Sequence, residues 1–142
     1  GERFEALLAP RRPLSPSFEL HARLSPALVL AGERVERFAQ RWSAFVRPHD
    51  LLVGWGFYAS ERLAAEGVAL PERLDLRGLA RQQLRKKTGE VGACARELGA
   101  ELPEPWAQGR AGERLTAAAA VTRALVAALR DGAPQLSENP RP

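Results

Sequence analysis

The residues with the clearest chemical potential lie in the stretch LLVGWGFYASERL, at positions 51–63. A short apolar run there gives way to glycines interleaved with aromatic residues, and then to a helical pattern. The turn between a buried strand and a helix holds side chains rigidly at a surface. The rings of Trp55, Phe57 and Tyr58 could therefore form a platform on which nucleic-acid bases stack. The alternative is that these three side chains are core residues beneath the helix that follows.

A group of basic residues follows this turn and is the second candidate for chemistry. Its members are Arg77, Arg81, Arg85, Lys86 and Lys87. They are expected along one helix and at its carboxyl end, where guanidinium and ammonium groups could bind phosphates. The alternative is structural, because the helix dipole favours basic side chains in a last turn whether or not a ligand binds.

Other chemistries have little support in the sequence. A single cysteine and two distant histidines, His21 and His49, give no recognisable zinc site. The phosphate-binding pattern GxxxxGK[ST] and the nucleophile pattern G-x-S-x-G are both absent. Cys94 occupies an apolar helical position, which is typical of a buried and inert thiol. We therefore expect no metal and no other cofactor.

Composition indicates an ordinary globular domain, with 45% hydrophobic and 27% charged residues among 142. The net charge of +4 permits a nucleic-acid partner, although arginine enrichment also fits the codon bias of a GC-rich genome. No apolar run approaches the ~18 residues of a membrane span, and no signal peptide is recognisable. We expect no membrane association, a cytoplasmic location, one domain over 1–130 and a flexible tail over 131–142.

Hydrophobic periodicity predicts an α/β fold with a small sheet. Strands are expected at 2–8 and 50–55 and around Leu74 and Leu76. Helices are expected at 32–47, 57–66, 77–86, 89–98 and 113–130, with a helical turn after Ser25 and Pro26. The sheet is small for this number of helices.

The same patterns predict which faces are buried. The continuously apolar strand at 50–55 is expected to be covered on both faces. In the helix at 57–66, Tyr58 is expected to point inward. The inward face expected for the last helix consists of Leu115, Ala118, Ala119, Thr122, Leu125, Val126 and Leu129.

Six landmarks in order resemble the proofreading-type 3′–5′ exonuclease domain, the DEDD group of the ribonuclease-H-like superfamily. The segments that carry the resemblance are FEALLAPRRPLSP, HARLSPALV, VERFAQRWSAFVRPHDLLVGWGFYASERLAAEGV, LPERLDLRGLARQQL, TGEVGACARELGAEL and ERLTAAAAVTRALVAAL. The resemblance implies a ribonuclease-H-like, exonuclease-type domain. Enzymes of that family hold two divalent cations on four carboxylates.

The resemblance also implies that this chemistry is missing. The histidine and asparagine of the second motif fall at Trp55 and Gly56, and its aspartate falls at Ser60. The third motif's histidine falls at Glu113 and its aspartate at Ala118. These five are degenerate motif positions, so no catalytic or metal-binding residue can be carried over.

Two further parts of the resemblance concern structure. Asp75 matches an aspartate that the family uses structurally and not as a metal ligand. The first motif, a D-x-E strand, would precede Gly1, so a truncated small sheet flanked by helices is expected. Its exposed edge would be open to a protein partner or to a preceding domain.

Three functions remain as alternatives. The first is a catalytically inactive exonuclease-like domain within a larger protein, which binds or positions RNA or single-stranded DNA. The second is a protein-interaction or scaffolding domain that uses the sheet edge or the alanine-rich helix. The third is a 3′–5′ exonuclease with relocated ligands such as Glu61 or Glu113. Glu61, however, lies one residue from Ser60 and would point about 100° away on a helix.

Overall fold

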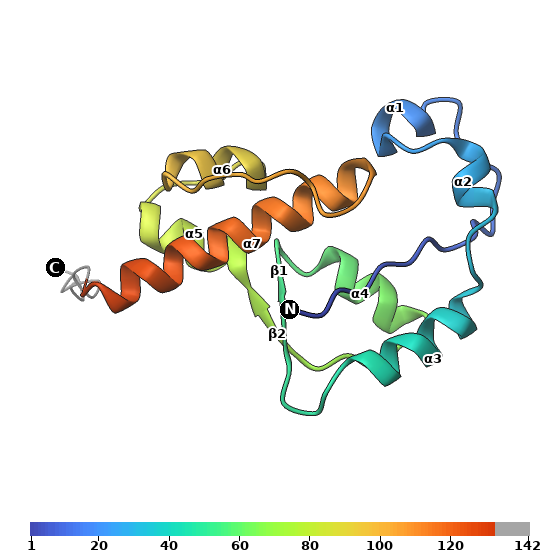
Figure 1. Cartoon of the computed structure of the whole chain (residues 1–142), viewed down its shortest axis with the longest axis horizontal. Helices are drawn as coiled ribbons and strands as arrows, with labels where there is room; N and C mark the ends of the chain where they lie inside the picture. Colours follow the sequence, from blue (N-terminus) through green and yellow to red (C-terminus); the bar gives the residue numbers. More distant parts are fainter. Residues whose placement is uncertain (133–142) are drawn as a thin grey trace, which may run out of the picture.

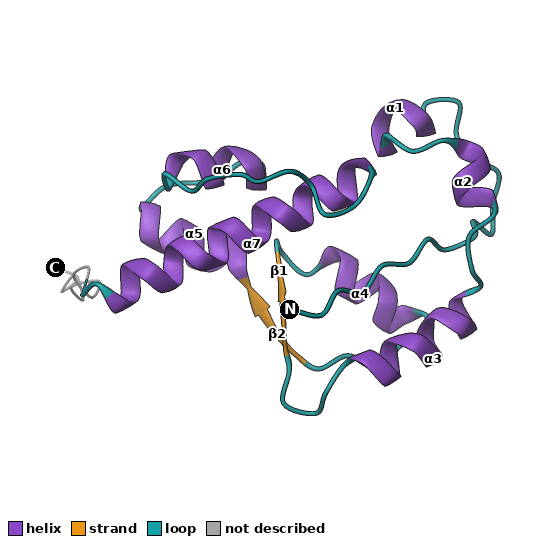
Figure 2. Cartoon of the chain, in the orientation of Figure 1, coloured by secondary structure: helices purple, strands orange, loops and turns teal. Residues whose placement is uncertain are grey.

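The computed structural model describes residues 1–132, which form helices around a two-stranded parallel sheet (Figures 1 and 2). In chain order the elements are α1 (Phe18–Ala22), α2 (Pro26–Leu30), α3 (Val35–Phe45), β1 (Leu51–Gly54), α4 (Tyr58–Ala65), β2 (Glu72–Asp75), α5 (Leu76–Leu84), α6 (Val91–Glu97) and α7 (Gly109–Arg130). Most of the predicted tail at 131–142 lies outside the described residues.

The sheet is a single parallel pair, in which Leu51 lies opposite Glu72 and Gly54 opposite Asp75. Parallel neighbours need a crossover connection, and α4 provides it. The prediction of a mixed α/β structure with a small sheet is confirmed. The ribonuclease-H-like, exonuclease-type fold stays a prediction.

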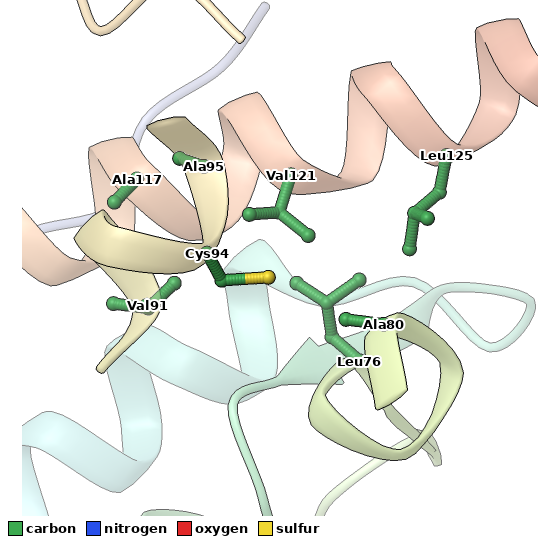
Figure 3. Packing of buried hydrophobic residues seen from close by; sticks show 8 residues of the cluster. All are labelled: Leu76, Ala80, Val91, Cys94, Ala95, Ala117, Val121 and Leu125. Carbon is green, nitrogen blue, oxygen red and sulfur yellow. The ribbon is translucent and has the colours of Figure 1, made fainter. Parts of the chain in front are cut away.

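One hydrophobic core joins the last three helices (Figure 3). Its buried members are Leu76 and Ala80 from α5, Val91, Cys94 and Ala95 from α6, and Ala117, Val121 and Leu125 from α7. Half of these side chains are alanine or cysteine, so the helix backbones can approach one another closely. Val53 and Trp55 pack against the core from the sheet side.

The predicted inward face of α7 is only partly right, because Leu125 is buried and Ala118 packs against the core, whereas the larger part of the face is not buried. Leu115, Val126 and Leu129 are exposed, whereas the neighbouring positions Thr116 and Val121 are buried. One position along a helix turns a side chain by about 100°, so the buried face is rotated from the expected one. The physical reason is that α5 and α6 pack against Ala117, Val121 and Leu125, and this contact leaves Leu115, Val126 and Leu129 outside.

The predicted strand at 2–8 is also wrong, because only Leu8 forms an isolated parallel bridge, with Glu33. The segment is held instead by an aromatic cluster on α3. The ring of Phe4 lies 5.7 Å from that of Phe38, 5.6 Å from Trp42 and 5.2 Å from Phe45, measured between centroids. The apolar alternation of this segment therefore reflects docking on a helix.

Two smaller predictions need correction. Leu51 is 47% exposed and the rest of β1 is half-buried, so β1 is not covered on both faces. The part of β1 that reaches the core is Val53, and Leu51 lies at the opposite end of the strand. Leu76 belongs to α5 and not to a strand, because Asp75 caps the helix directly before it. The predicted turn after Ser25 is confirmed as α2, with the Ser25 hydroxyl accepting from the amide of Leu28.

Candidate nucleic-acid interface

Asp75, the last residue of β2, links the carboxyl end of this strand to the turn that follows β1. Its Oδ1 accepts a hydrogen bond from the amide of Gly56 at 3.2 Å and another from the amide of Arg77 at 3.0 Å. The second bond caps the amino end of α5. Gly56 has φ of +79°, a conformation that glycine adopts without steric cost. The turn after β1 and the start of α5 are therefore one connected unit.

The three aromatic residues of this turn have different environments. Trp55 packs against the core, as the structural alternative expects. Phe57 is exposed in part, and the guanidinium of Arg73 lies 5.1 Å from the centre of its ring. Tyr58 is 78% exposed, so the prediction that it points inward is wrong. It is the first residue of α4, a helix in which no residue is buried. Phe57 and Tyr58 are the aromatic surfaces that a ligand could reach.

Ser60, one of the degenerate motif positions, forms a hydrogen bond with the guanidinium of Arg73. Its hydroxyl donates to the carbonyl of Phe57 at 2.9 Å and accepts from Nη1 of Arg73 at 3.2 Å. A guanidinium at this position would repel a divalent metal ion. Sequence reasoning missed Arg73, although strand alternation places it on the same face as Asp75.

The two remaining degenerate positions have structural roles. Both carboxylate oxygens of Glu113 accept from Nη1 of Arg23 at 2.7 Å, which ties the segment after α1 to α7. Ala118 packs against the core. Within residues 1–132, no three His, Cys, Asp or Glu side chains are grouped so that they could hold a metal ion.

Cys94 is buried in the core, as predicted from its helical position. Burial raises the pKa of its thiol above the ordinary value, and the charge of Glu97 adds to this effect. The thiolate that a nucleophile requires is thus disfavoured.

The structure brings four of the five predicted basic residues together. Arg81, Arg85, Lys86 and Lys87 line one surface hollow of about 540 Å³ at the end of α5, which we call the α5 hollow. Arg77 is directed elsewhere, since its Nη2 donates to the carbonyl of Thr88 at 3.3 Å.

Few carboxylates neutralise these cations. Nζ of Lys86 pairs with Glu97 at 3.0 Å. In the part of the chain that the structure describes, no carboxylate lies within ion-pair distance of Arg81, Arg85 or Lys87. The α5 hollow therefore presents an excess of positive charge to solvent.

Comparison with known proteins gives no family assignment: no family model, no curated protein and no solved structure matches the chain. The resemblance to DEDD exonucleases therefore stays a prediction. Among the helices of residues 1–132, none combines the length and the apolar character that crossing a membrane requires.

Proposed function

We propose that the chain is a non-catalytic module that binds single-stranded RNA or DNA at the α5 hollow. The observation that supports this function is the convergence of Arg81, Arg85, Lys86 and Lys87 around one hollow. Phosphates of a nucleic-acid backbone are the natural partners of such a group, because they are closely spaced and each carries a full negative charge.

The aromatic turn would add contacts to bases. Asp75 links this turn to the start of α5, so Phe57 and Tyr58 lie on elements that are joined directly to the basic helix. Stacking of a base on an exposed ring contributes about 1–3 kcal/mol and tolerates any sequence. Binding with strong salt dependence and little sequence preference is the expected result.

Absence of catalysis is part of the proposal. The neutral hydroxyl of Ser60 and the methyl group of Ala118 supply none of the negative charge with which carboxylates hold a divalent cation. The carboxylate of Glu113 is already engaged by Arg23. A module of this kind would hold a strand for chemistry performed elsewhere, as a preceding or partner domain could provide.

The first prediction concerns the triple variant Arg81→Ala, Arg85→Ala and Lys87→Ala. Binding of a labelled single-stranded oligonucleotide, followed by fluorescence anisotropy at several salt concentrations, should weaken markedly at low salt. The slope of log K against log salt should fall by about 2, because three phosphate contacts are lost at roughly 0.7 each.

A charge-matched control for this experiment is Arg110→Ala, Arg123→Ala and Arg130→Ala on α7, which removes three exposed cations outside the hollow. The control should keep most of the affinity. Wild-type protein without salt-dependent binding would refute the proposed function. Equal losses in both triple variants would show that net charge alone attracts the strand.

A second candidate function, protein interaction, is favoured by the outward face of α7. Leu115, Val126 and Leu129 are exposed there at spacings that place them along one side of the helix. In the described residues β1 also pairs with β2 alone, so its other edge is open. Exposed apolar rows of this kind mark association surfaces.

The second prediction follows from this candidate. Nuclease-treated protein should form a homodimer in light scattering coupled to size-exclusion chromatography, and Leu129→Glu together with Val126→Glu should return it to the monomer. Because both side chains are exposed, the variant should keep its fold, as circular dichroism can show. A wild-type monomer at high micromolar concentration would exclude self-association through α7.

A further inference from the structure

A second positively charged hollow lies away from the α5 hollow, between the amino-terminal segment, α3 and α4. It has a volume of about 760 Å³. The charged side chains that line it are Arg11, Arg12, Arg34, Arg62, Glu36 and Glu66. We call it the arginine hollow. Four arginines and two glutamates leave it with a formal charge of +2.

The chain holds the walls of the arginine hollow in place by main-chain pairing. The amide of Ala9 donates to the carbonyl of Glu33 at 2.9 Å, and the amide of Glu33 donates to the carbonyl of Leu7 at 2.7 Å. Gly32 makes this approach possible, because a Cβ atom there would lie 2.6 Å from the oxygen of Leu7. Arg11 and Arg12 follow shortly after Ala9, so the main chain brings them beside the start of α3.

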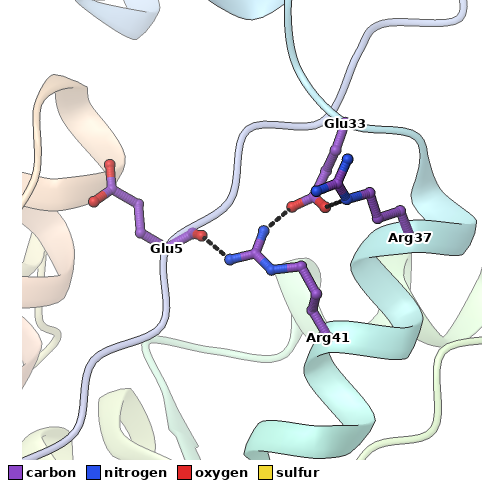
Figure 4. A network of polar contacts seen from close by, with 4 residues as sticks. All are labelled: Glu5, Glu33, Arg37 and Arg41. Carbon is purple, nitrogen blue, oxygen red and sulfur yellow. Dashed lines mark hydrogen bonds and ion pairs between the residues drawn. The ribbon is translucent and has the colours of Figure 1, made fainter.

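A polar network supports the same wall from the other side (Figure 4). The carboxylate of Glu33 is held by Arg41, a hydrogen-bond donor, and by Arg37, whose Nε lies 3.8 Å away. Nη2 of Arg41 also donates to the carbonyl of Glu5 at 3.1 Å. The carboxylate of Glu33 is largely buried, so this network ties α3 to the amino-terminal segment.

Two of the four guanidinium groups in the hollow have carboxylate partners. Arg11 pairs with Glu66 at 2.8 Å and Arg34 with Glu36 at 3.4 Å. All of these groups are exposed, and exposed ion pairs contribute little free energy, so a ligand can replace them. Among the contacts of residues 1–132, neither Arg12 nor Arg62 has a carboxylate within ion-pair distance.

The arginines of the hollow also contribute to the ionisation of Glu36. Its pKa lies below the ordinary value, first because its own backbone amide donates a hydrogen bond to the carboxylate. The guanidinium groups of Arg34 and Arg11 lower the pKa further. Glu36 also lies in the first turn of α3, where the free amides and the helix dipole favour an anion.

We propose that the arginine hollow binds a phosphate group, through Arg12 and Arg62 in particular. A guanidinium donates two parallel hydrogen bonds to a pair of phosphate oxygens, which a compact ammonium cannot do. A phosphate monoester near pH 7 carries close to two negative charges. It would therefore match the formal charge of the hollow. The group could be a free phosphate compound or the terminal phosphate of a strand.

The third prediction tests this site with inorganic phosphate, titrated into the full chain by isothermal calorimetry at constant ionic strength set with chloride. We expect saturable binding that weakens by about tenfold or more in the double variant Arg12→Ala and Arg62→Ala. The double variant Arg110→Ala and Arg123→Ala, with the same net charge, should bind like the wild type. No saturable binding, or equal binding by the two double variants, would overturn the proposal.

Two further experiments test how the phosphate is recognised and where it comes from. The double variant Arg12→Lys and Arg62→Lys keeps the charge but loses the planar guanidinium groups that donate paired hydrogen bonds. We therefore expect it to bind inorganic phosphate more weakly than the wild type. Unchanged affinity would overturn a site that recognises phosphate by guanidinium geometry. Oligonucleotides with and without a 5′-phosphate distinguish the sources. If the wild type prefers the phosphorylated oligonucleotide and the Arg12→Ala and Arg62→Ala variant loses this preference, the ligand is the phosphate at a strand end. If the wild type binds both oligonucleotides equally but still binds inorganic phosphate, the ligand is a free phosphate compound.

Phosphate binding at the arginine hollow and strand binding at the α5 hollow can be refuted independently of each other. The variant Arg81→Ala, Arg85→Ala and Lys87→Ala leaves the arginine hollow intact and should bind inorganic phosphate like the wild type. Loss of phosphate binding in that variant would overturn the assignment to the arginine hollow. It would leave the proposed function of the α5 hollow standing.

Discussion

Asp75 performs two structural tasks with one oxygen, and this explains why a carboxylate at the end of a strand need not be catalytic. It accepts from Gly56, which is 19 residues away in the sequence, and from Arg77 in the first turn of α5. Gly78 leaves room for this carboxylate, because a Cβ atom there would lie 2.9 Å from Oδ2.

The fourth prediction, at the residue scale, is that Asp75→Ala lowers the free energy of unfolding by about 2 kcal/mol. Loss of the helix cap contributes roughly 1 kcal/mol, and the unpaired amide of Gly56 contributes a similar amount. Urea unfolding measures the change. Asp75→Asn retains an accepting oxygen and should lose less than half as much. An alanine variant as stable as the wild type would show that water replaces both bonds without cost.

At this scale the sequence could predict residue types but not their partners. The resemblance assigned a structural role to Asp75, and its position before an apolar helix pattern agrees with a cap. The pairing of Glu113 with Arg23 spans 90 residues, and nothing in the local pattern of either segment indicates it. Arg73 could have been found by strand alternation, but its contacts with Ser60 and Phe57 depend on where α4 lies.

Among the elements, α7 shows how a correct helix can be predicted with the wrong face. Its periodicity and alanine content predict the helix, which begins four residues before the expected start at 113. The expected inward face included Leu115, Val126 and Leu129, but the buried face consists of Gly112, Thr116, Ala117, Ala120, Val121 and Leu125. Close packing favours small side chains where helices cross, and this preference depends on neighbours that a single helix pattern does not contain.

The fifth prediction contrasts two positions on α7. Val121→Ala should destabilise the protein by about 2 kcal/mol, because it removes fully buried methyl groups and leaves a cavity. Leu129→Ala should change stability by less than about 0.5 kcal/mol, since that side chain is 74% exposed. Thermal unfolding of the two variants is the measurement. A larger loss at Leu129 would mean that the inward face first expected for α7 is the buried one.

The strand expected at 2–8 failed for a different reason. A strand exists only with a hydrogen-bonded neighbour, so alternation alone cannot establish one. Phe4 packs on the rings of α3, and the main-chain pairing of this segment is limited to Glu33, which forms a bridge with Leu8 and donates to the carbonyl of Leu7. By contrast, β1 and β2 lie where strands were expected, at 50–55 and around Leu74, and each is followed by a helix.

For the whole molecule, the two positively charged hollows belong to different parts of the fold. The α5 hollow is lined by α5 and the residues just after it, and the arginine hollow by the amino-terminal segment, the start of α3 and α4. Figure 1 shows α5 on one side of the strands and α3 and α4 on the other. The net charge permitted a nucleic-acid partner, although the arginine content also fits codon bias. These bulk properties could not show two separate hollows, because Arg11, Arg12, Arg34 and Arg62 converge only through the approach of the amino-terminal segment to α3.

The core also has a consequence for how the chain reaches this structure. All of its buried members come from one continuous stretch between Leu76 and Leu125. Contacts within a short stretch require little loop closure, so this helical unit can form early on the folding pathway. The amino-terminal part is held by the packing of Phe4 on α3 and by the ion pair of Arg23 with Glu113. It would therefore fold last and unfold first. Partial unfolding of the amino-terminal part would thus disrupt the arginine hollow and leave the α5 hollow intact.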